Sequence, residues 1–174
     1  MNLALLVLRV VTGLLFAGHG AQKLFGILGG NGVDGTAAFF EKIGLRPGRL
    51  HAIAAGSAEF GGGLFIAGGL LTPFAAAALI GVMTAAVITV HGRNGVWVTE
   101  NGFEYNLVLA AVVFALAGVG AGSWSLDHAL GLDVAGAAWA LGALAVGLLG
   151  GVAAVLSGRL SHPRQQGVSP VHPT

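Results

Sequence analysis

Cysteine is absent from this chain of 174 residues, and charged residues make up only 9% of it. Without a thiol the protein makes no disulfide, has no thiolate nucleophile and cannot ligate an iron–sulfur cluster through its own side chains. A soluble domain carries about 25% charged residues, so the surface of this chain is not one that faces water. The formal net charge of +1 gives no electrostatic basis for nucleic-acid binding, and we expect no nucleic-acid partner.

Hydrophobic residues make up 55% of the chain and form five runs long enough to cross about 30 Å of hydrocarbon at about 1.5 Å per residue. We predict membrane-spanning helices over Leu3–Phe25, His51–Leu71, Pro73–His91, Glu104–Ala121 and Val134–Leu156. The first run contains Arg9 and no basic residue precedes it, so it is predicted to be a retained span and not a signal peptide. The 31 glycines have no regular period and are expected to let helix backbones approach closely.

The predicted fold class is therefore all-α, a polytopic membrane protein with a four-helix transmembrane bundle and a fifth C-terminal transmembrane helix. We divide the chain into the bundle at 1–132, the added helix at 133–158 and a disordered cytoplasmic tail at 159–174. An alternative arrangement has four spans, with the last apolar segment packed at the periphery. The longest connection is 26–50, and Thr36–Gly44 within it is predicted to be a short amphipathic helix at the membrane interface.

Basic residues in the short connections predict the orientation, because cytoplasmic loops carry an excess of Lys and Arg. They follow the first, third and fifth spans and are Lys42, Arg46, Arg49, Arg93, Arg159 and Arg164. The connections on the opposite side carry almost none. We therefore expect a multi-pass protein of the cell (plasma) membrane, with its N-terminus outside and its C-terminus in the cytoplasm.

The first span contains ionisable residues at membrane depth. At about 100° per residue, one sector of this helix roughly 80° wide contains Arg9, Thr12, Phe16, His19 and Lys23. Charged groups in hydrocarbon cost several kcal/mol, so this sector is expected to face the bundle interior or a wet cavity and to find partners there.

Other spans bring polar groups to the level of His19 and Lys23. Glu59 lies about 12 Å into the second span from its cytoplasmic end. We expect Glu59 to pair with His19 or Lys23, and Glu104 to pair with His91 or Lys23. Two structural readings stay open beside this one: Glu59 as a clamp that only fixes packing, and Lys23 as a residue that extends to the interface.

The candidates for ligand binding or proton relay are Arg9, His19, Lys23, Glu59, His91, Glu104 and Tyr105. No catalytic residue is assigned. No metal site is predicted, because no single helix has two His or carboxylate ligands at metal-binding spacing.

Three ordered motifs resemble the DoxX family of small integral membrane proteins. The first is Arg9 with Gly13-Leu14-Leu15-Phe16 and His19-Gly20-Ala21-Gln22-Lys23-Leu24-Phe25-Gly26. The second is Glu59-Phe60-Gly61-Gly62-Gly63-Leu64 with Gly68-Gly69-Leu70-Leu71-Thr72, and the third is Asn101-Gly102-Phe103-Glu104-Tyr105-Asn106-Leu107. Ser125-Leu126-Asp127 resembles the point where such chains commonly end. The resemblance covers about residues 3–132 and implies a compact four-helix membrane bundle with sulfur redox or oxidative-stress associations.

The function that the resemblance and the buried polar residues favour is a redox-associated membrane subunit. It would handle a quinone or a small sulfur species through a buried His/Lys/Glu cluster, with quinone as the one cofactor considered. The chain lacks cysteine, a haem-attachment motif and a flavin fold, so electrons would have to pass to the quinone directly or through a partner. Whether the chain is an enzyme stays open.

Two alternatives are kept: a non-catalytic assembly or scaffolding subunit that anchors redox or stress proteins at the membrane, and a small transporter. The expected partners are the lipid bilayer, a cytoplasmic redox or sulfur-handling protein and further copies of this chain.

Overall fold

The computed structural model describes residues 2–132 and 134–161, and these form helices joined by turns, bends and irregular segments, with no β-strand among them. The helices are α1 Asn2–Phe25, α2 Gly32–Lys42, α3 Gly48–Gly68, α4 Thr72–Ala86, α5 Glu104–Val119, α6 Leu126–Ala129 and α7 Ala137–Leu160. A π-helical turn at Val87–His91 and 3-10 turns at Gly92–Asn94 and Val98–Glu100 follow α4.

Four helices are long and apolar enough to cross a membrane: α1, α3, α7 and α4 with its continuation to Asn94. The fifth apolar helix, α5, has 16 residues. These helices confirm the predicted all-α polytopic fold, with ends shifted by a few residues. The last helix begins at Ala137 and reaches Leu160, so it includes the first residues of the predicted tail. Residues 162–174 of that tail lie outside the described residues.

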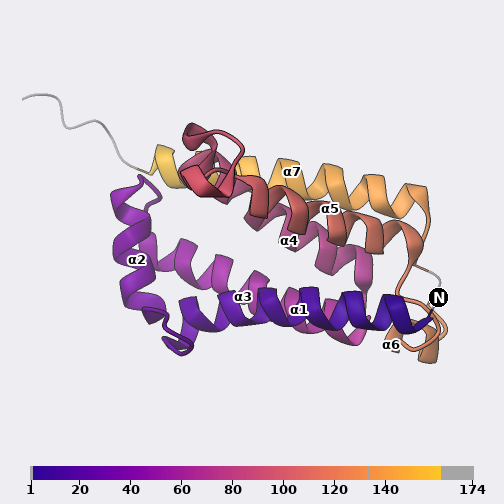
Figure 1. The fold of residues 1–174 in the computed structure, drawn as a ribbon. Helices are drawn as coiled ribbons and strands as arrows, with labels where there is room; N and C mark the ends of the chain where they lie inside the picture. The colour runs from indigo at the N-terminus through magenta and orange to yellow at the C-terminus, as the bar shows by residue number, and fades with distance from the viewer. Residues whose placement is uncertain (1, 133, 162–174) are drawn as a thin grey trace, which may run out of the picture.

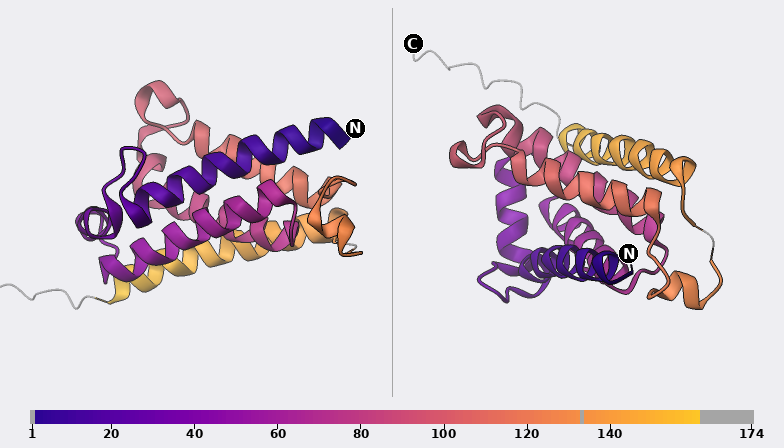
Figure 2. Two further views of the ribbon diagram at one scale, coloured as in Figure 1. Left: turned by 90° about the horizontal axis from the view of Figure 1, so that it is seen from below. Right: turned by 45° about the vertical axis from the view of Figure 1, so that its right-hand side comes forward.

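The helices form two layers. One contains α1 and α3, the other contains α4, α5 and α7, and α2 runs across one end of both (Figures 1 and 2). The most extensive contacts join α1 to α3 and α4 to α7. The amphipathic helix predicted at Thr36–Gly44 is therefore present as α2, and it begins at Gly32.

Glycines allow α1 and α3 to lie in near backbone contact. A Cβ atom on Gly13 or Gly20 would collide with backbone atoms of α3, and one on Gly63 would collide with α1. The polar sector predicted on α1 faces inward at this interface: Arg9 is 1% exposed, Thr12 4% and Phe16 0%. Gly63 belongs to the Gly-rich run after Glu59, so the predicted close packing of this run is confirmed at that position.

Asp127, on the short helix α6, holds the turn between α3 and α4. Its carboxylate accepts hydrogen bonds from Leu71 N at 2.7 Å, Thr72 N at 3.2 Å and Thr72 Oγ1 at 2.7 Å. It thus caps the start of α4, where backbone N–H groups lack helical partners. It also stabilises Leu71 at a φ of 47°, a left-handed conformation that non-glycine residues rarely adopt.

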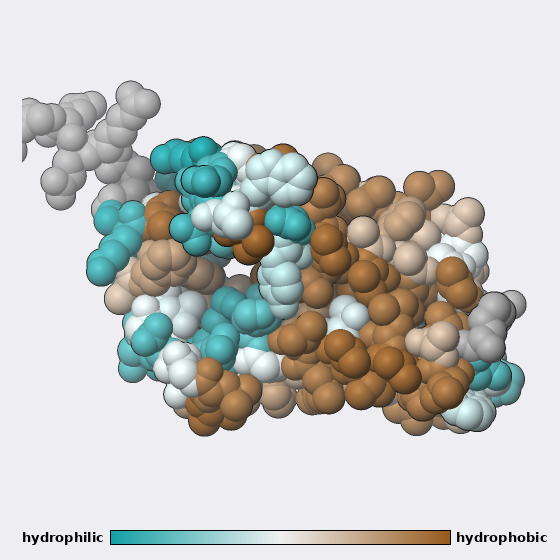
Figure 3. All heavy atoms as spheres, in the orientation of Figure 1, coloured by the Kyte–Doolittle hydropathy of each residue, from teal (hydrophilic) through white to brown (hydrophobic). Residues whose placement is uncertain are grey.

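The surface is apolar along the length of the bundle, and polar side chains gather at the two ends (Figure 3). The end crossed by α2 also receives the loop between α4 and α5 and the end of α7. The opposite end carries the N-terminus of α1, the α3–α4 turn and α6 (Figure 1).

Replacing Asp127 by Ala is expected to lower the free energy of unfolding by about 2 kcal/mol, because three donors at the start of α4 lose their acceptor. Thermal unfolding followed by circular dichroism in detergent measures the change. The matched control is Asp34→Ala, which removes only the exposed ion pair with Arg49 and should leave the melting temperature nearly unchanged. Equal effects of the two substitutions would contradict the capping role.

Candidate functional site

An ion pair between Lys23 of α1 and Glu59 of α3 lies at the centre of the candidate site. Lys23 Nζ donates a hydrogen bond to Glu59 Oε2 at 2.6 Å. The Glu59 side chain is 3% exposed and that of Lys23 25%. This contact confirms one of the two partners predicted for Glu59. Among the described residues, no group donates a hydrogen bond to the other carboxylate oxygen, Oε1.

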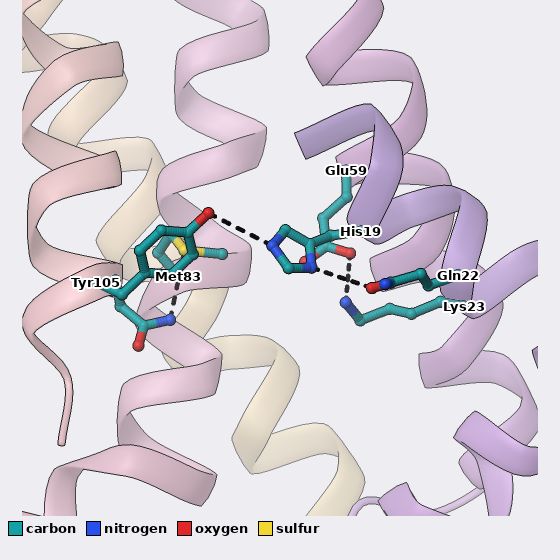
Figure 4. A network of polar contacts seen from close by, with 7 residues as sticks. His19, Gln22, Lys23, Glu59, Met83 and Tyr105 are labelled. Atoms are coloured by element: carbon teal, nitrogen blue, oxygen red, sulfur yellow. Dashed lines mark hydrogen bonds and ion pairs between the residues drawn. The ribbon is translucent and has the colours of Figure 1, made fainter. Parts of the chain in front are cut away.

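A second set of polar contacts extends from the ion pair toward α5. His19 Nδ1 lies 3.2 Å from Gln22 Oε1, and Gln22 Nε2 donates to Leu28 O at 2.9 Å. On the other side of the ring, His19 Nε2 lies 3.5 Å from the hydroxyl of Tyr105. The two rings meet edge to face, with centroids 6.0 Å apart. Figure 4 shows Tyr105 and His19 facing each other across the space between α5 and α1, with Lys23 and Glu59 beside His19.

A cavity of about 810 Å³ lies between the two helix layers and includes the ion pair in its wall. Three more polar side chains line it, His51, Thr89 and His91, and the remaining wall is apolar. Thr89 and His91 come from the π-helical turn Val87–His91. Such turns are rare and are frequent at functional sites. A cavity of this size, mostly apolar with a few convergent polar groups, is typical of a small-molecule site.

Arg9 lies away from this cavity, near the opposite end of α1. Its Nη2 donates to the backbone oxygen of Trp124 at 2.5 Å, and the negative charge of Asp127 acts on it. Its Nε and Nη1 are buried and have no partner among the described residues. Arg9 therefore belongs to the contacts that hold the segment before α6 against α1 and α3, and not to the Lys23–Glu59 group.

The predicted pairing of Glu104 with His91 or Lys23 was wrong. Glu104 Oε2 instead accepts a hydrogen bond from Val98 N at 2.9 Å, and His91 Nδ1 lies 2.9 Å from Asn101 O. Both side chains stabilise the backbone of the loop between α4 and α5. The reason is local: backbone hydrogen bonds from Phe103 N to Gly95 O and from Glu104 N to Val96 O fold this loop back onto the start of α5, which brings Val98 N within reach of Glu104.

The sequence analysis missed several residues of the site. Gln22 lies off the predicted polar sector, yet it holds His19 by a side-chain contact only one helical turn away. Thr89 and His51 belong to no motif, and the residues of α7 that line the cavity are all Gly, Ala or Val. No three His, Asp or Glu side chains converge as a metal site within residues 2–132 and 134–161.

Two comparisons with known proteins found a match, one to a family model and one to a curated relative. The model of the DoxX family matches residues 4–92. A protein of Bacillus subtilis (strain 168) named "Putative oxidoreductase CatD" is 34% identical over 113 residues, which are 65% of this chain and 78% of the relative. No solved structure matches the chain at a comparable level of significance.

Replacing Lys23 by Met is expected to lower the free energy of unfolding by about 3 kcal/mol, because it leaves Glu59 as an unpaired buried carboxylate. The double variant Lys23→Met with Glu59→Gln should regain part of this loss, since no charge then remains to be paired. Chemical unfolding in detergent is measured for the wild type, for the single variants Lys23→Met and Glu59→Gln, and for the double variant. The four free energies of unfolding together give the coupling energy between the two side chains. Additive effects of the two substitutions would show that the pair does not couple.

Proposed function

This chain belongs to the DoxX family of membrane proteins, and from that premise and the geometry of the cavity we propose that it is a redox-associated membrane subunit that binds a quinone. The observation that carries the proposal is the placement of one ion pair, Lys23–Glu59, in the wall of a mostly apolar cavity of about 810 Å³. A quinone has the matching chemistry, with a ring that carries two carbonyl oxygens and a hydrocarbon tail. The relative's name, an oxidoreductase, is consistent with this reading.

The ion pair suits both redox forms of a quinone. Lys23 has three N–H donors, of which one is given to Glu59, so another can donate to a quinone carbonyl. Glu59 Oε1 can accept a hydrogen bond from the hydroxyl of the reduced form. Reduction takes up two electrons and two protons, and we propose that His19, which lies beside the ion pair and 3.5 Å from the hydroxyl of Tyr105, passes these protons to the site (Figure 4). We propose that a partner redox protein supplies the two electrons, since this chain has no cysteine thiol that could donate them.

A small sulfur anion is less well matched to this cavity. An anion such as thiosulfate would need cations that are not already neutralised, and Lys23 is paired with Glu59 at 2.6 Å. The apolar wall would also remove water from the anion without replacing its hydrogen bonds, which is costly. A quinone ring is neutral and has only two hydrogen-bond acceptors, so its transfer into the cavity does not carry the desolvation cost of an anion.

We also propose that the protein lies in the cell membrane with its N-terminus outside. This proposal is supported by the segments at the end of the bundle crossed by α2, which contain five basic residues: Lys42, Arg46, Arg49, Arg93 and Arg159. That end would be cytoplasmic. The polar part of the cavity would then lie nearer the cytoplasm, where an electron-donating partner can reach it.

Glu59→Gln is expected to weaken the binding of a quinone to the detergent-purified protein about tenfold or more, because a hydrogen bond to a charged group is lost. Tryptophan fluorescence quenching or calorimetry measures the affinity, and circular dichroism shows whether the variant is folded. Glu104→Gln is the matched control and should bind as the wild type does, since the carboxylate of Glu104 accepts a hydrogen bond from Val98 N in the loop and does not line the cavity. Quinone binding that survives in Glu59→Gln would overturn the proposal.

The orientation can be tested with single cysteines, because the natural chain has none. Ser123 and Ser161 are exposed at opposite ends of the bundle. In intact cells a membrane-impermeant maleimide should label Ser123→Cys directly and Ser161→Cys only after lysis. The reverse pattern would place the N-terminus in the cytoplasm.

A further inference from the structure

One wall of the cavity is formed by α7, a helix that lies beyond the residues matched by the family model. The residues of α7 that line the cavity are Val146, Gly147, Gly150, Gly151, Ala154 and Val155. The facing wall comes from α3, and α4 lies between the two. Contacts between α3 and α7 are sparse, whereas α4 packs closely against both. The cavity is therefore a groove whose floor is α4.

The glycines of α7 are of two kinds. A Cβ on Gly147 would lie 2.7 Å from the side chain of Ile80, and one on Gly151 would be 2.7 Å from that of Thr84, so these two glycines bring α7 close to α4. Gly150 is different, because a Cβ there would have no neighbour within 4 Å. Gly150 thus faces the open space of the groove. Helix packing against α4 does not require glycine at this position.

The groove has a polar part and an apolar part. Lys23, Glu59 and His91 line it toward the end crossed by α2, as do Phe39 and Phe40 of that helix. Toward the other end the lining on α4 continues through Ala78 and Ala77 to Phe74, with Val146 opposite on α7. Phe74 is 56% exposed and Val146 63%, although both lie in membrane-spanning helices. The apolar part of the groove is consequently open to the hydrocarbon between α3 and α7.

We infer that α7 and α4 hold the hydrocarbon tail of the quinone and that the ligand enters sideways from the bilayer between α3 and α7. This inference rests on the proposed function, because the ring is placed at the Lys23–Glu59 pair. The polar and apolar parts of the groove determine how the quinone is oriented in it. The ring needs hydrogen-bond partners and lies in the polar part, whereas the tail needs only apolar contact and lies in the apolar part. The small side chains along α7 leave the groove wide enough for a branched prenyl chain. The size of the side chain at position 150 would therefore determine which quinone tails the protein accepts.

The test compares two quinones with the same ring, one without a tail and one with two isoprene units. Gly150→Leu is expected to weaken binding of the tailed quinone about tenfold, because apolar contact area on the tail is lost. Binding of the tail-less quinone should stay unchanged. Gly142→Leu is the matched control, since a Cβ on Gly142 of α7 also has no neighbour within 4 Å, and Gly142 does not line the groove. It should leave both affinities as in the wild type.

Gly150→Ala gives a second variant with a smaller side chain, for which a smaller loss of tailed-quinone binding is expected. Helix content and melting temperature are recorded for every variant. Equal weakening of both quinones by Gly150→Leu would overturn the tail assignment, as would no effect on either one. A phospholipid that the tailed quinone cannot displace from the wild-type protein would also overturn it, because a lipid chain would then be the occupant of the groove.

The same experiment separates this inference from the proposed function. If the wild type binds neither quinone, the proposed function fails. If it binds both in a manner that depends on Glu59, and Gly150→Leu does not discriminate between them, only the role of α7 fails.

Discussion

The ion pair between Lys23 and Glu59 is the constraint on which the rest of the bundle depends. A charged group at membrane depth costs several kcal/mol unless it finds a partner, so the two helices that carry this pair must remain together. The glycines of the interface bring α1 and α3 into near backbone contact, and the ion pair, with 2.6 Å between Nζ and Oε2, links the two helices at this interface. The abundance of glycine and the scarcity of charge therefore serve the same arrangement.

The two ends of the bundle are held together in different ways. At the end with α6, hydrogen bonds of Arg9 and Asp127 tie the segment before α7 to α1 and to the α3–α4 turn. At the other end α2 crosses both layers, α4 loosens into a π-helical turn, and the space between the layers stays open. The ion pair lies on the open side. One end thus fixes the geometry, and the other leaves room beside a charged pair.

Much of this fold follows from the sequence, because the cost of exposing backbone and charge to hydrocarbon leaves few choices. From that cost the sequence predicts the five apolar helices, the inward-facing sector of α1 and the contact between Lys23 and Glu59. The cavity could not be predicted from the sequence. Its volume depends on the distance between the two helix layers, and no local sequence pattern encodes this distance. Glu104 was misassigned for a related reason: a residue at a helix end can reach either a neighbouring helix or its own loop, and here the loop is closer.

The two sides of the Lys23–Glu59 pair differ in chemistry, and under the proposed function this bears on why one ion pair would be enough to hold a quinone ring. On the α3–α7 side the lining is apolar and faces the hydrocarbon, so a lipid-soluble ligand reaches the pair without crossing water. On the other side His19 lies beside the ion pair and faces Tyr105 of α5, although neither ring lines the cavity (Figure 4). Under the proposed function, the quinone and its protons arrive from opposite sides and meet at Lys23 and Glu59. Additional charged side chains in the cavity would then weaken the binding of the quinone's apolar tail without improving the binding of its ring.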